Sequence, residues 1–451
     1  LLAKETLAMK ELMVVSTCNR FEIYFNTEQY SQIEQLISLF AAYKWIPARA
    51  FRNQIRHSEG EQAVRHLFHV ALGLESKILG DLQIINQVKR AYQLSHELDY
   101  LLWLFRKIKI TNGKDKGVYQ TEKIMIATGS HASSLPNVRI DEKQIVSSTG
   151  ALALTTLPKK LVVIGAGYIG LELGTIWARL GAEVEVIEFL PRILPGMDEE
   201  VAKKFMAIAK RQGLNFRLKT SVRSAEVSRT GVSLTVLPAN GGDEEQVNAD
   251  VVLVSVGRHP AINGLGLEEA GVVVSESGRI KVDSRFETSV EDIFAIGDVI
   301  DGPMLAHKAE EDGVAAVELM AGLAGHVDYD AVPGIVYTAP EVATLGKSEE
   351  ALKEKGMSYV KGVFPFQANS RAKAVGHTDG LVKILACAET DRVLGVHIIG
   401  HEAGTVIHEC ATAMAFGASA EDIARTCHGH PTLNEAVKEA ALAVDGRAIH
   451  M

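Results

Sequence analysis

Residues 161–189 read LVVIGAGYIGLELGTIWARLGAEVEVIEF, and this stretch decides the fold of the centre of the chain. The apolar run at 161–164 predicts a buried strand. Residues 169–180 predict an apolar-faced helix, and 183–187 predict a second strand that ends at Glu188. A G-x-G-x-x-G motif stands between the first strand and the helix. This order is typical of a Rossmann-type βαβ unit.

Each glycine of the motif has a mechanical reason. Gly165 permits the tight turn, Gly167 leaves the backbone open to a pyrophosphate, and Gly170 lets the helix pack on the strand. The helix N-terminus attracts phosphate, and a carboxylate at Glu188 suits ribose hydroxyls but repels a 2′-phosphate. We therefore expect NAD rather than NADP, with Glu172 as a further cofactor contact; the alternative is a structural βαβ unit without ligand.

The amino-acid composition limits the class of protein to which this chain can belong. The chain has 451 residues, of which 47% are hydrophobic and 23% charged, as expected of a soluble globular protein of about three domains. A net charge of −9 argues against a general nucleic-acid binder. No apolar run approaches the roughly 20 residues of a membrane span. The four cysteines are scattered, which indicates a reducing compartment, and we expect a cytoplasmic protein.

The first hundred residues form a separate α/β piece with balanced charge. Alternation predicts a strand at 21–25, and apolar periodicity predicts helices at 31–43, 61–72 and 83–97. Residues 101–109 match neither neighbouring segment and suggest a helix start, a frayed linker or a stretch without meaning at a fusion point.

This piece resembles the catalytic N-terminal domain of glutamyl-tRNA reductase. The resemblance rests on VSTCNR at 15–20, AVRHLF at 63–68, GLES at 73–76 and LGDLQI at 79–84. It implies that Cys18 attacks an aminoacyl ester, that His66 is a nearby base, that Arg20 holds the substrate carboxylate, and that tRNA and NADPH take part. A thiolate beside a base is a good acyl acceptor. The alternative for Cys18 is a small buried core residue.

From residue 119 onward the sequence resembles dihydrolipoamide dehydrogenase. The motifs are IATGS at 126–130, the unit at 161–189, VGRHP at 256–260, IGD at 296–298, MLAH at 304–307 and HGHPTLNEA at 428–436. The resemblance implies a homodimeric flavoprotein in which dihydrolipoamide reduces a protein disulfide, and electrons then pass to FAD and on to NAD. It also implies a lipoyl-bearing 2-oxo acid dehydrogenase complex as partner.

Several residues support a flavin site on their own terms. The apolar strands at 124–127 and 292–296 end in small or acidic residues, where α/β folds bind ligands. The residues that we expect to contact cofactor are Thr128, Gly129, Ser130, Gly257, Asp298, Met304, Leu305, Ala306 and His307. The alternatives are an N-cap or turn role for Asp298 and an ordinary turn at 128–130.

His430 and Glu435 are the candidate acid–base pair. A histidine can take a proton from a thiol, and a carboxylate on its other nitrogen fixes the tautomer. Alternatively, Thr432 and Glu435 form a capping box that opens a helix at 434–442. The spacing of Cys427, His428 and His430 fits no common zinc pattern, so we expect no metal.

The C-terminal part predicts an antiparallel domain. Strands at 381–386 and 393–399 flank a turn, and a helix of small residues follows at 406–416. The resemblance makes this the dimer interface, against the alternative of an internal helix pair.

Two features of the resembled family are not encoded in these residues. No second strand–G-x-G-x-x-G–helix unit is present, and no two cysteines have four residues between them. We therefore expect lipoamide turnover to be absent, FAD binding to be doubtful, and the strands at 124 and 292 to lack burying neighbours. An alternative is a non-catalytic, NAD-binding, dimerising chimera. The predicted domains are 1–100, a partial FAD domain at 101–158 and 286–325, a NAD domain at 159–285 and an α+β dimerisation domain at 326–451.

Overall fold

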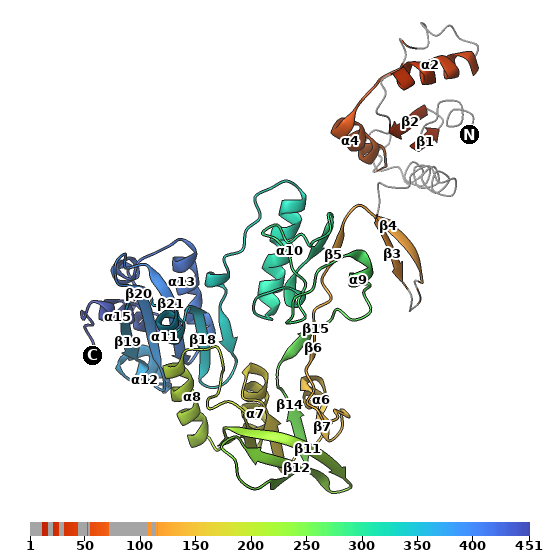
Figure 1. Ribbon diagram of the computed structural model, residues 1–451. Helices are drawn as coiled ribbons and strands as arrows, with labels where there is room; N and C mark the ends of the chain where they lie inside the picture. The colour runs from red at the N-terminus through yellow and green to blue at the C-terminus, as the bar shows by residue number, and fades with distance from the viewer. Residues whose placement is uncertain are drawn as a thin grey trace. The chain divides into compact units, whose positions relative to one another are not determined.

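A computed structural model describes residues 11–16, 21–26, 31–43, 52, 55–71, 106–110, 114 and 116–451. It divides into two compact units, Leu1–Ile124 and Met125–Met451 (Figure 1). Among the described residues, no helix combines the length and apolar character that a membrane crossing requires.

In the first unit, the described residues form two hairpins and two helices. Strands β1 (Glu11–Ser16) and β2 (Phe21–Asn26) pair antiparallel, followed by α2 (Ser31–Tyr43) and α4 (Gly60–Ala71). The predicted strand at 21–25 and the helices at 31–43 and 61–72 are confirmed; the helix predicted at 83–97 lies outside the described residues. Residues 106–110 form β3 (Arg106–Ile110), paired with β4 (Gly117–Thr121), so a helix is wrong for 106–109, while 101–105 lie outside the described residues.

The second unit is built on a parallel sheet with the order β10-β9-β8-β14-β7. Its strands and helices are β7 (Ile145–Val146), α6 (Ser148–Ala153), β8 (Lys160–Ile164), α7 (Tyr168–Leu180), β9 (Glu183–Ile187), α8 (Glu199–Arg211), β10 (Asn215–Arg217) and β14 (Val251–Val254). The predicted strand–helix–strand at 161–187 is confirmed as β8, α7 and β9. The Rossmann fold follows from the parallel order.

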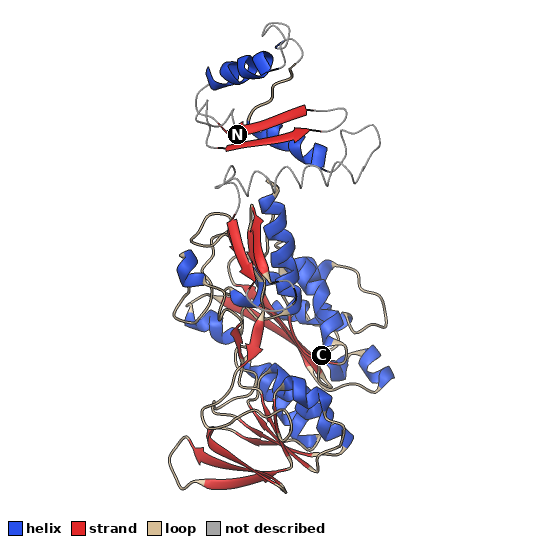
Figure 2. Cartoon of the chain, turned by 90° about the vertical axis from the view of Figure 1, so that its right-hand side faces the viewer, coloured by secondary structure: helices blue, strands red, loops and turns tan. Residues whose placement is uncertain are grey.

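Alternation along β8 explains the layers. Leu161 and Val163 pack toward the helices, whereas Val162 and Ile164 pack against an antiparallel meander on the other face. The meander consists of β11 (Thr220–Ser228), β12 (Gly231–Pro238) and β13 (Glu245–Ala249). At the bottom of Figure 2, strands accordingly have helices along one side only.

Short elements connect this sheet to the rest of the unit. They are β5 (Ile124–Ile126), β6 (Ser130–Ala132), β15 (Arg258–Pro260), α9 (Leu267–Ala270), β16 (Ile293–Ala295), η1 (Gly297–Val299), α10 (Ala306–Met320) and η2 (Tyr329–Ala331). The Ile296 N–H donates to the Ile126 carbonyl at 3.0 Å. Phe294 and Ala295 are buried, so the expectation that the strand at 292–296 lacks burying neighbours is wrong.

The C-terminal domain is an antiparallel sheet with the order β17-β18-β21-β20-β19. Its elements are β17 (Gly334–Val336), β18 (Glu341–Gly346), α11 (Glu349–Glu354), β19 (Tyr359–Pro365), η3 (Phe366–Ala368), α12 (Ser370–Val375), β20 (Leu381–Cys387), β21 (Val393–Gly400), α13 (Ala403–Ala415), α14 (Ala420–Arg425) and α15 (Glu435–Val444). The predicted hairpin at 381–399 and the helices at 406–416 and 434–442 are confirmed. The α/β fold class, with a Rossmann part and an α+β C-terminal part, is therefore confirmed, while the domain bounds stay predictions.

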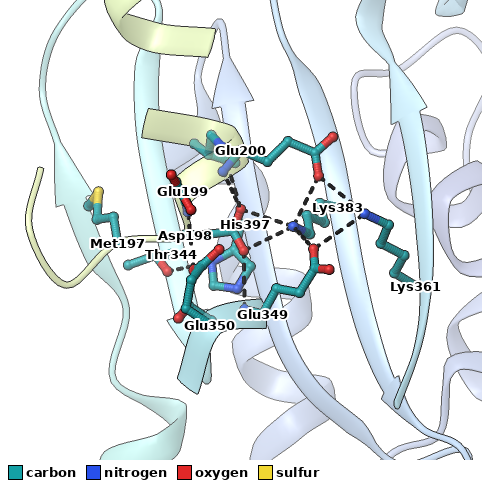
Figure 3. Close-up of polar contacts among 12 residues, drawn as sticks. Met197, Asp198, Glu199, Glu200, Thr344, Glu349, Glu350, Lys361, Lys383 and His397 are labelled. Carbon is teal, nitrogen blue, oxygen red and sulfur yellow. Dashed lines mark hydrogen bonds and ion pairs between the residues drawn. The ribbon is translucent and has the colours of Figure 1, made fainter. Parts of the chain in front are cut away.

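A charged cluster around a completely buried lysine joins α8 to the antiparallel sheet (Figure 3). Its members are Lys383, Asp198, Glu200, Glu349 and Lys361, and we call it the Lys383 cluster. The Lys383 Nζ lies 3.0 Å from both Asp198 carboxylate oxygens and 2.6 Å from Glu349 Oε2. Asp198 is also the N-cap of α8, because its side chain accepts from the Glu200 and Val201 N–H groups.

Candidate functional site

The glycine turn between β8 and α7 has the geometry that the sequence predicted. Gly165 has a φ of +101°, and a Cβ there would lie 2.4 Å from the Ser255 carbonyl oxygen. Gly167 is the N-cap of α7 without a side-chain cap, and a Cβ there would meet nothing within 4 Å. A Cβ on Gly170 would lie 2.1 Å from the Gly165 carbonyl oxygen. The space above Gly167 thus opens onto a helix end that can receive an anion.

Glu188 closes one side of this turn. Its Oε2 accepts from the Ala166 N–H at 2.7 Å, and its Oε1 accepts from the Leu190 N–H at 2.8 Å. The residue is 9% exposed. The carboxylate is therefore fixed beside the glycine turn, with acceptor lone pairs left over for a sugar hydroxyl.

Glu172 points away from the turn toward the following domain. It lies on α7, and its Oε1 accepts from the Tyr337 N–H at 2.9 Å. Burial raises the pKa of the Glu172 carboxyl, and burial together with the charge of Glu172 raises the pKa of Tyr168. Glu172 and Tyr168 are thus two partly desolvated acidic side chains on the helix that follows the glycine turn.

A cavity of about 270 Å³ lies between the ends of β5 and β16 and the start of α10. Its lining residues are Ala127, Gly129, Arg258, Ile296, Gly297, Asp298, Met304, Ala306 and Ala309. Four of these lie in the motifs that the sequence singled out at 128–130, 298 and 304–307, and two more, Ala127 and Gly297, come directly before one of these motifs. Its walls are mostly apolar, with one carboxylate and one guanidinium.

Three polar side chains meet at this cavity, two of which, Arg258 and Asp298, line it. The Ser130 hydroxyl donates to Asp298 Oδ2 at 2.5 Å, and the Arg258 Nε donates to Ser130 Oγ at 2.7 Å. Arg258 also donates to the Ser130 carbonyl oxygen at 2.7 Å. Asp298 lies in η1, so a carboxylate acceptor faces the cavity rather than capping a helix of its own. Hydroxyl groups of a ligand would find acceptors and donors here.

The remaining residues predicted for this cofactor support the cavity or lie beside it. The Thr128 hydroxyl donates to the Ala261 carbonyl at 2.7 Å. Gly257 has a φ of +110°, and Leu305 is the N-cap of α10. A ring nitrogen of His307 is 2.8 Å from the Pro333 carbonyl oxygen, so His307 ties α10 to the next segment. Arg258 was quoted in a motif but not predicted as a site residue, since only the fold shows its contact with Ser130.

His430 and Glu435 come together at the start of α15. His430 Nδ1 lies 2.9 Å from Glu435 Oε1, and the imidazole side chain is 69% exposed. Burial acts to raise the pKa of Glu435, but the hydrogen bonds from the Thr432 N–H and from His430 outweigh it and lower the pKa. A carboxylate held ionised in this way can orient the histidine ring.

The alternative capping box forms only in part. The Thr432 N–H donates to Glu435 Oε2 at 2.8 Å, as a box requires. The Thr432 hydroxyl, however, donates to the Gly429 carbonyl oxygen, and the N-cap of α15 is Asn434. The prediction of Thr432 as the reciprocal cap is therefore wrong, because a turn at 429–432 takes its hydroxyl.

A second histidine–carboxylate pair was missed from the sequence. His428 Nε2 lies 2.5 Å from Glu409 Oε1, and Asn434 donates to Glu409 Oε2 at 2.6 Å. The hydrogen bond to Glu409 raises the pKa of His428. Glu409 lies on α13, far from His428 in the sequence, so no local pattern could have joined them.

The cysteines and the first unit provide few contacts among the predicted site residues. Cys387, Cys410 and Cys427 are free thiols, and no group of three or more His, Cys, Asp or Glu in the described part of the chain could hold a metal ion. Cys18 and Arg20 lie outside the described residues. His66 is described, and its Nε2 lies 3.1 Å from Glu22 Oε1.

The parallel sheet with its glycine turn defines a Rossmann-type α/β protein that carries an antiparallel C-terminal domain. Residues 40–313 match the pyridine nucleotide-disulphide oxidoreductase family, and residues 332–441 match the dimerisation domain of that family. The chain belongs to the pyridine nucleotide-disulphide oxidoreductase family.

Curated relatives lie within this family. The chain is 56% identical over 366 residues to the mitochondrial dihydrolipoyl dehydrogenase of Pisum sativum, which covers 77% of this chain and 73% of the relative. It is 58% identical over 336 residues to the leghemoglobin reductase of Glycine max, covering 74% and 64%. The human mitochondrial dihydrolipoyl dehydrogenase is 52% identical over 350 residues, covering 76% and 69%. The chain thus spans about two thirds of the length of the curated relatives that it matches.

Solved structures agree on the fold. The flavoprotein disulfide reductase RclA of Escherichia coli superposes with a TM-score of 0.68 at 24% identity, over 83% of this chain and 87% of the other. LpdA of Mycobacterium tuberculosis gives a TM-score of 0.68 at 24% identity, over 84% and 86%. At 24% sequence identity, this similarity shows a shared fold and does not show a shared activity.

Proposed function

We propose that this chain binds NAD at the N-terminus of α7 and is a protein of the dihydrolipoyl dehydrogenase type. The observation that carries the proposal is the open space above Gly167, bounded by the fixed carboxylate of Glu188. A pyrophosphate fits the uncapped helix end, and the Glu188 carboxylate suits a ribose with free hydroxyls while repelling a 2′-phosphate. NAD is therefore favoured over NADP.

Gly167→Val tests this proposal. The added side chain meets no protein atom within 4 Å of its Cβ, and the φ of −84° is compatible with valine, so the fold is expected to be unchanged. The NADH dissociation constant is expected to rise about 100-fold, equivalent to about 2.7 kcal/mol. Fluorescence titration with NADH measures the affinity, and thermal unfolding measures the stability.

Gly174→Ala is the control for that experiment. It lies on the same helix, and its Cβ would make ordinary contacts with Val163 and Val184 at 3.5 and 3.6 Å. It is expected to bind NADH like the unmodified chain. Equal NADH affinity in Gly167→Val and Gly174→Ala would remove the dinucleotide site from this turn.

We propose further that the cavity beside Asp298 receives the ribityl chain of FAD. The donor set fits that group, since Asp298 accepts from hydroxyls and Arg258 donates, while Met304 and Ile296 line apolar walls. FAD would supply two-electron transfer between a dithiol and the nicotinamide. His430, held by Glu435, would take the thiol proton. At the start of α10, Leu305, Ala306 and His307 would lie beside the flavin.

Turnover of lipoamide is expected to be absent or impaired. The 451 residues contain no Cys-x₄-Cys pair and no second glycine-rich βαβ unit to anchor the FAD pyrophosphate. The substrate assignment itself, dihydrolipoamide with NAD, rests on the relatives named dihydrolipoyl dehydrogenase.

We also propose a homodimer through the C-terminal domain and a 2-oxo acid dehydrogenase complex as partner. The cytoplasmic location stays a prediction, while several relatives are named mitochondrial.

A second candidate function concerns the first unit. We propose glutamyl-tRNA reduction with Cys18 as nucleophile as the alternative, favoured by the contact between His66 and Glu22, which would orient a base. Deacylation of glutamyl-tRNA, abolished by Cys18→Ser, is the expected result under this alternative, and deacylation no faster than in buffer contradicts it. A non-catalytic chimera that binds NAD and self-associates would instead show NADH binding without any turnover.

A further inference from the structure

The first two turns of α10 contain an ion pair that is completely buried. The Lys308 Nζ lies 2.7 Å from Asp312 Oδ2, and both side chains are 0% exposed. Pairs at this spacing on a helix surface contribute little and are easily replaced. Moving both charges out of water is costly, so a buried pair needs further hydrogen-bond partners to persist.

Two of those partners are the N–H and the carbonyl group of one residue, Gly297. Lys308 Nζ donates to the Gly297 carbonyl oxygen at 3.0 Å, and Asp312 Oδ2 accepts from the Gly297 N–H at 3.0 Å. Lys308 also donates to the Asp301 carbonyl at 3.3 Å. The other oxygen of Asp312 accepts from the Tyr329 hydroxyl at 2.7 Å, which fixes the carboxylate in place.

Gly297 is the hinge of the turn that presents Asp298. It has a φ of +72°, and a Cβ there would lie 3.0 Å from the Cβ of Ala309 on α10. Rotation of the peptide between residues 297 and 298 would swing the Asp298 carboxylate away from Ser130. That rotation breaks the charge-assisted hydrogen bond from Lys308 to the Gly297 carbonyl, while the bond from the Gly297 N–H to Asp312 holds the preceding peptide in place.

We propose that Lys308 and Asp312 are positioning residues that hold the turn at 297–298 so that the Asp298 carboxylate faces the cavity. This inference rests on the proposed function of that cavity as the ribityl site of FAD. The pair does not touch the ligand. It sets the orientation of the group that does, because it fixes the backbone on which Asp298 stands.

Two substitutions that keep the branched shape of aspartate separate positioning from stability. Asp312→Asn and Asp312→Leu both remove the counter-charge of Lys308, so both lower the melting temperature. Asn keeps an oxygen that accepts from the Gly297 N–H, and Leu does not. Positioning therefore predicts an FAD dissociation constant within about threefold of the unmodified chain for Asn and at least about tenfold higher for Leu.

Hydrogen exchange at the Gly297 amide is the second readout. An amide that donates to a buried carboxylate exchanges slowly, so protection is expected in the unmodified chain and in Asp312→Asn and is lost in Asp312→Leu. This measurement needs no flavin. FAD affinity is followed by quenching of flavin fluorescence in the full chain.

Gly297→Ala covers the case in which Asp312→Leu does not fold. Its Cβ pushes against Ala309 and disfavours the positive φ, so it shifts the turn while leaving Lys308 and Asp312 in place. At least about tenfold weaker FAD binding is expected. Unchanged FAD affinity in Gly297→Ala, or equal losses in Asp312→Asn and Asp312→Leu, overturns the inference. An unmodified chain that binds no FAD overturns the proposed flavin site itself, and the inference falls with it.

Discussion

Replacing Lys383 by methionine is expected to lower the free energy of unfolding by about 3–5 kcal/mol. The side chain is completely buried and is the cation that Asp198 and Glu349 share. Methionine fills a similar volume but leaves the completely buried Asp198 carboxylate without its ammonium partner. Urea unfolding followed by circular dichroism measures the loss.

Lys361→Met is the matched control. Its Nζ lies 3.3 Å from the same Glu349 Oε2, but its side chain is 46% exposed, so a loss of at most about 1 kcal/mol is expected. Equal losses for the two lysines would mean that burial is not what makes the Lys383 cluster stabilising.

The same cluster predicts how the Lys383→Met effect depends on pH. Burial acts to raise the pKa of Glu349, but hydrogen bonds from Lys353 and Lys383 hold that pKa well below the ordinary value of 4.5. A lowered folded pKa gives stability that is present above pH 4.5 and is lost as the pH falls. The gap between the unmodified chain and Lys383→Met should therefore narrow below pH 4.5.

The sequence predicts the dinucleotide turn because each requirement there is local. A strand, three glycines and an acid at the next strand end follow one another within residues 161–188, and β8, α7 and β9 appear where the pattern places them. Only the fold shows that Glu188 also fixes the turn, since its hydrogen bond from the Ala166 N–H joins the two ends of the unit.

The Lys383 cluster could not be predicted in the same way. Residues 381–386 read as an apolar strand with a single lysine, and such a lysine on a hairpin usually faces water. Its partners come from the N-cap of α8 and from α11. Lys308 and Asp312 were missed for a related reason: their spacing on α10 is that of an ordinary surface pair, and only burial shows otherwise.

Gly170→Ala is expected to destabilise the chain by about 3 kcal/mol, the upper end of what overpacking costs, and to abolish NADH binding. The new Cβ would lie 2.1 Å from the Gly165 carbonyl oxygen and 2.6 Å from Ser255 Oγ. Neither atom can move cheaply, because the Gly165 N–H donates to the Ile187 carbonyl and Ser255 donates to the Ile164 carbonyl. Helix α7 must therefore separate from β8.

The three glycine positions on α7 and its turn give three different results if this geometry is right. Gly170→Ala loses stability and NADH together, Gly167→Val loses NADH at unchanged stability, and Gly174→Ala loses neither. The added alanine at 174 is even expected to raise helix stability by up to about 1 kcal/mol. Unfolding experiments measure the stability of all three variants, and titration with NADH measures their affinity. Normal stability in Gly170→Ala would contradict the close packing of α7 on β8, on which the pyrophosphate site depends.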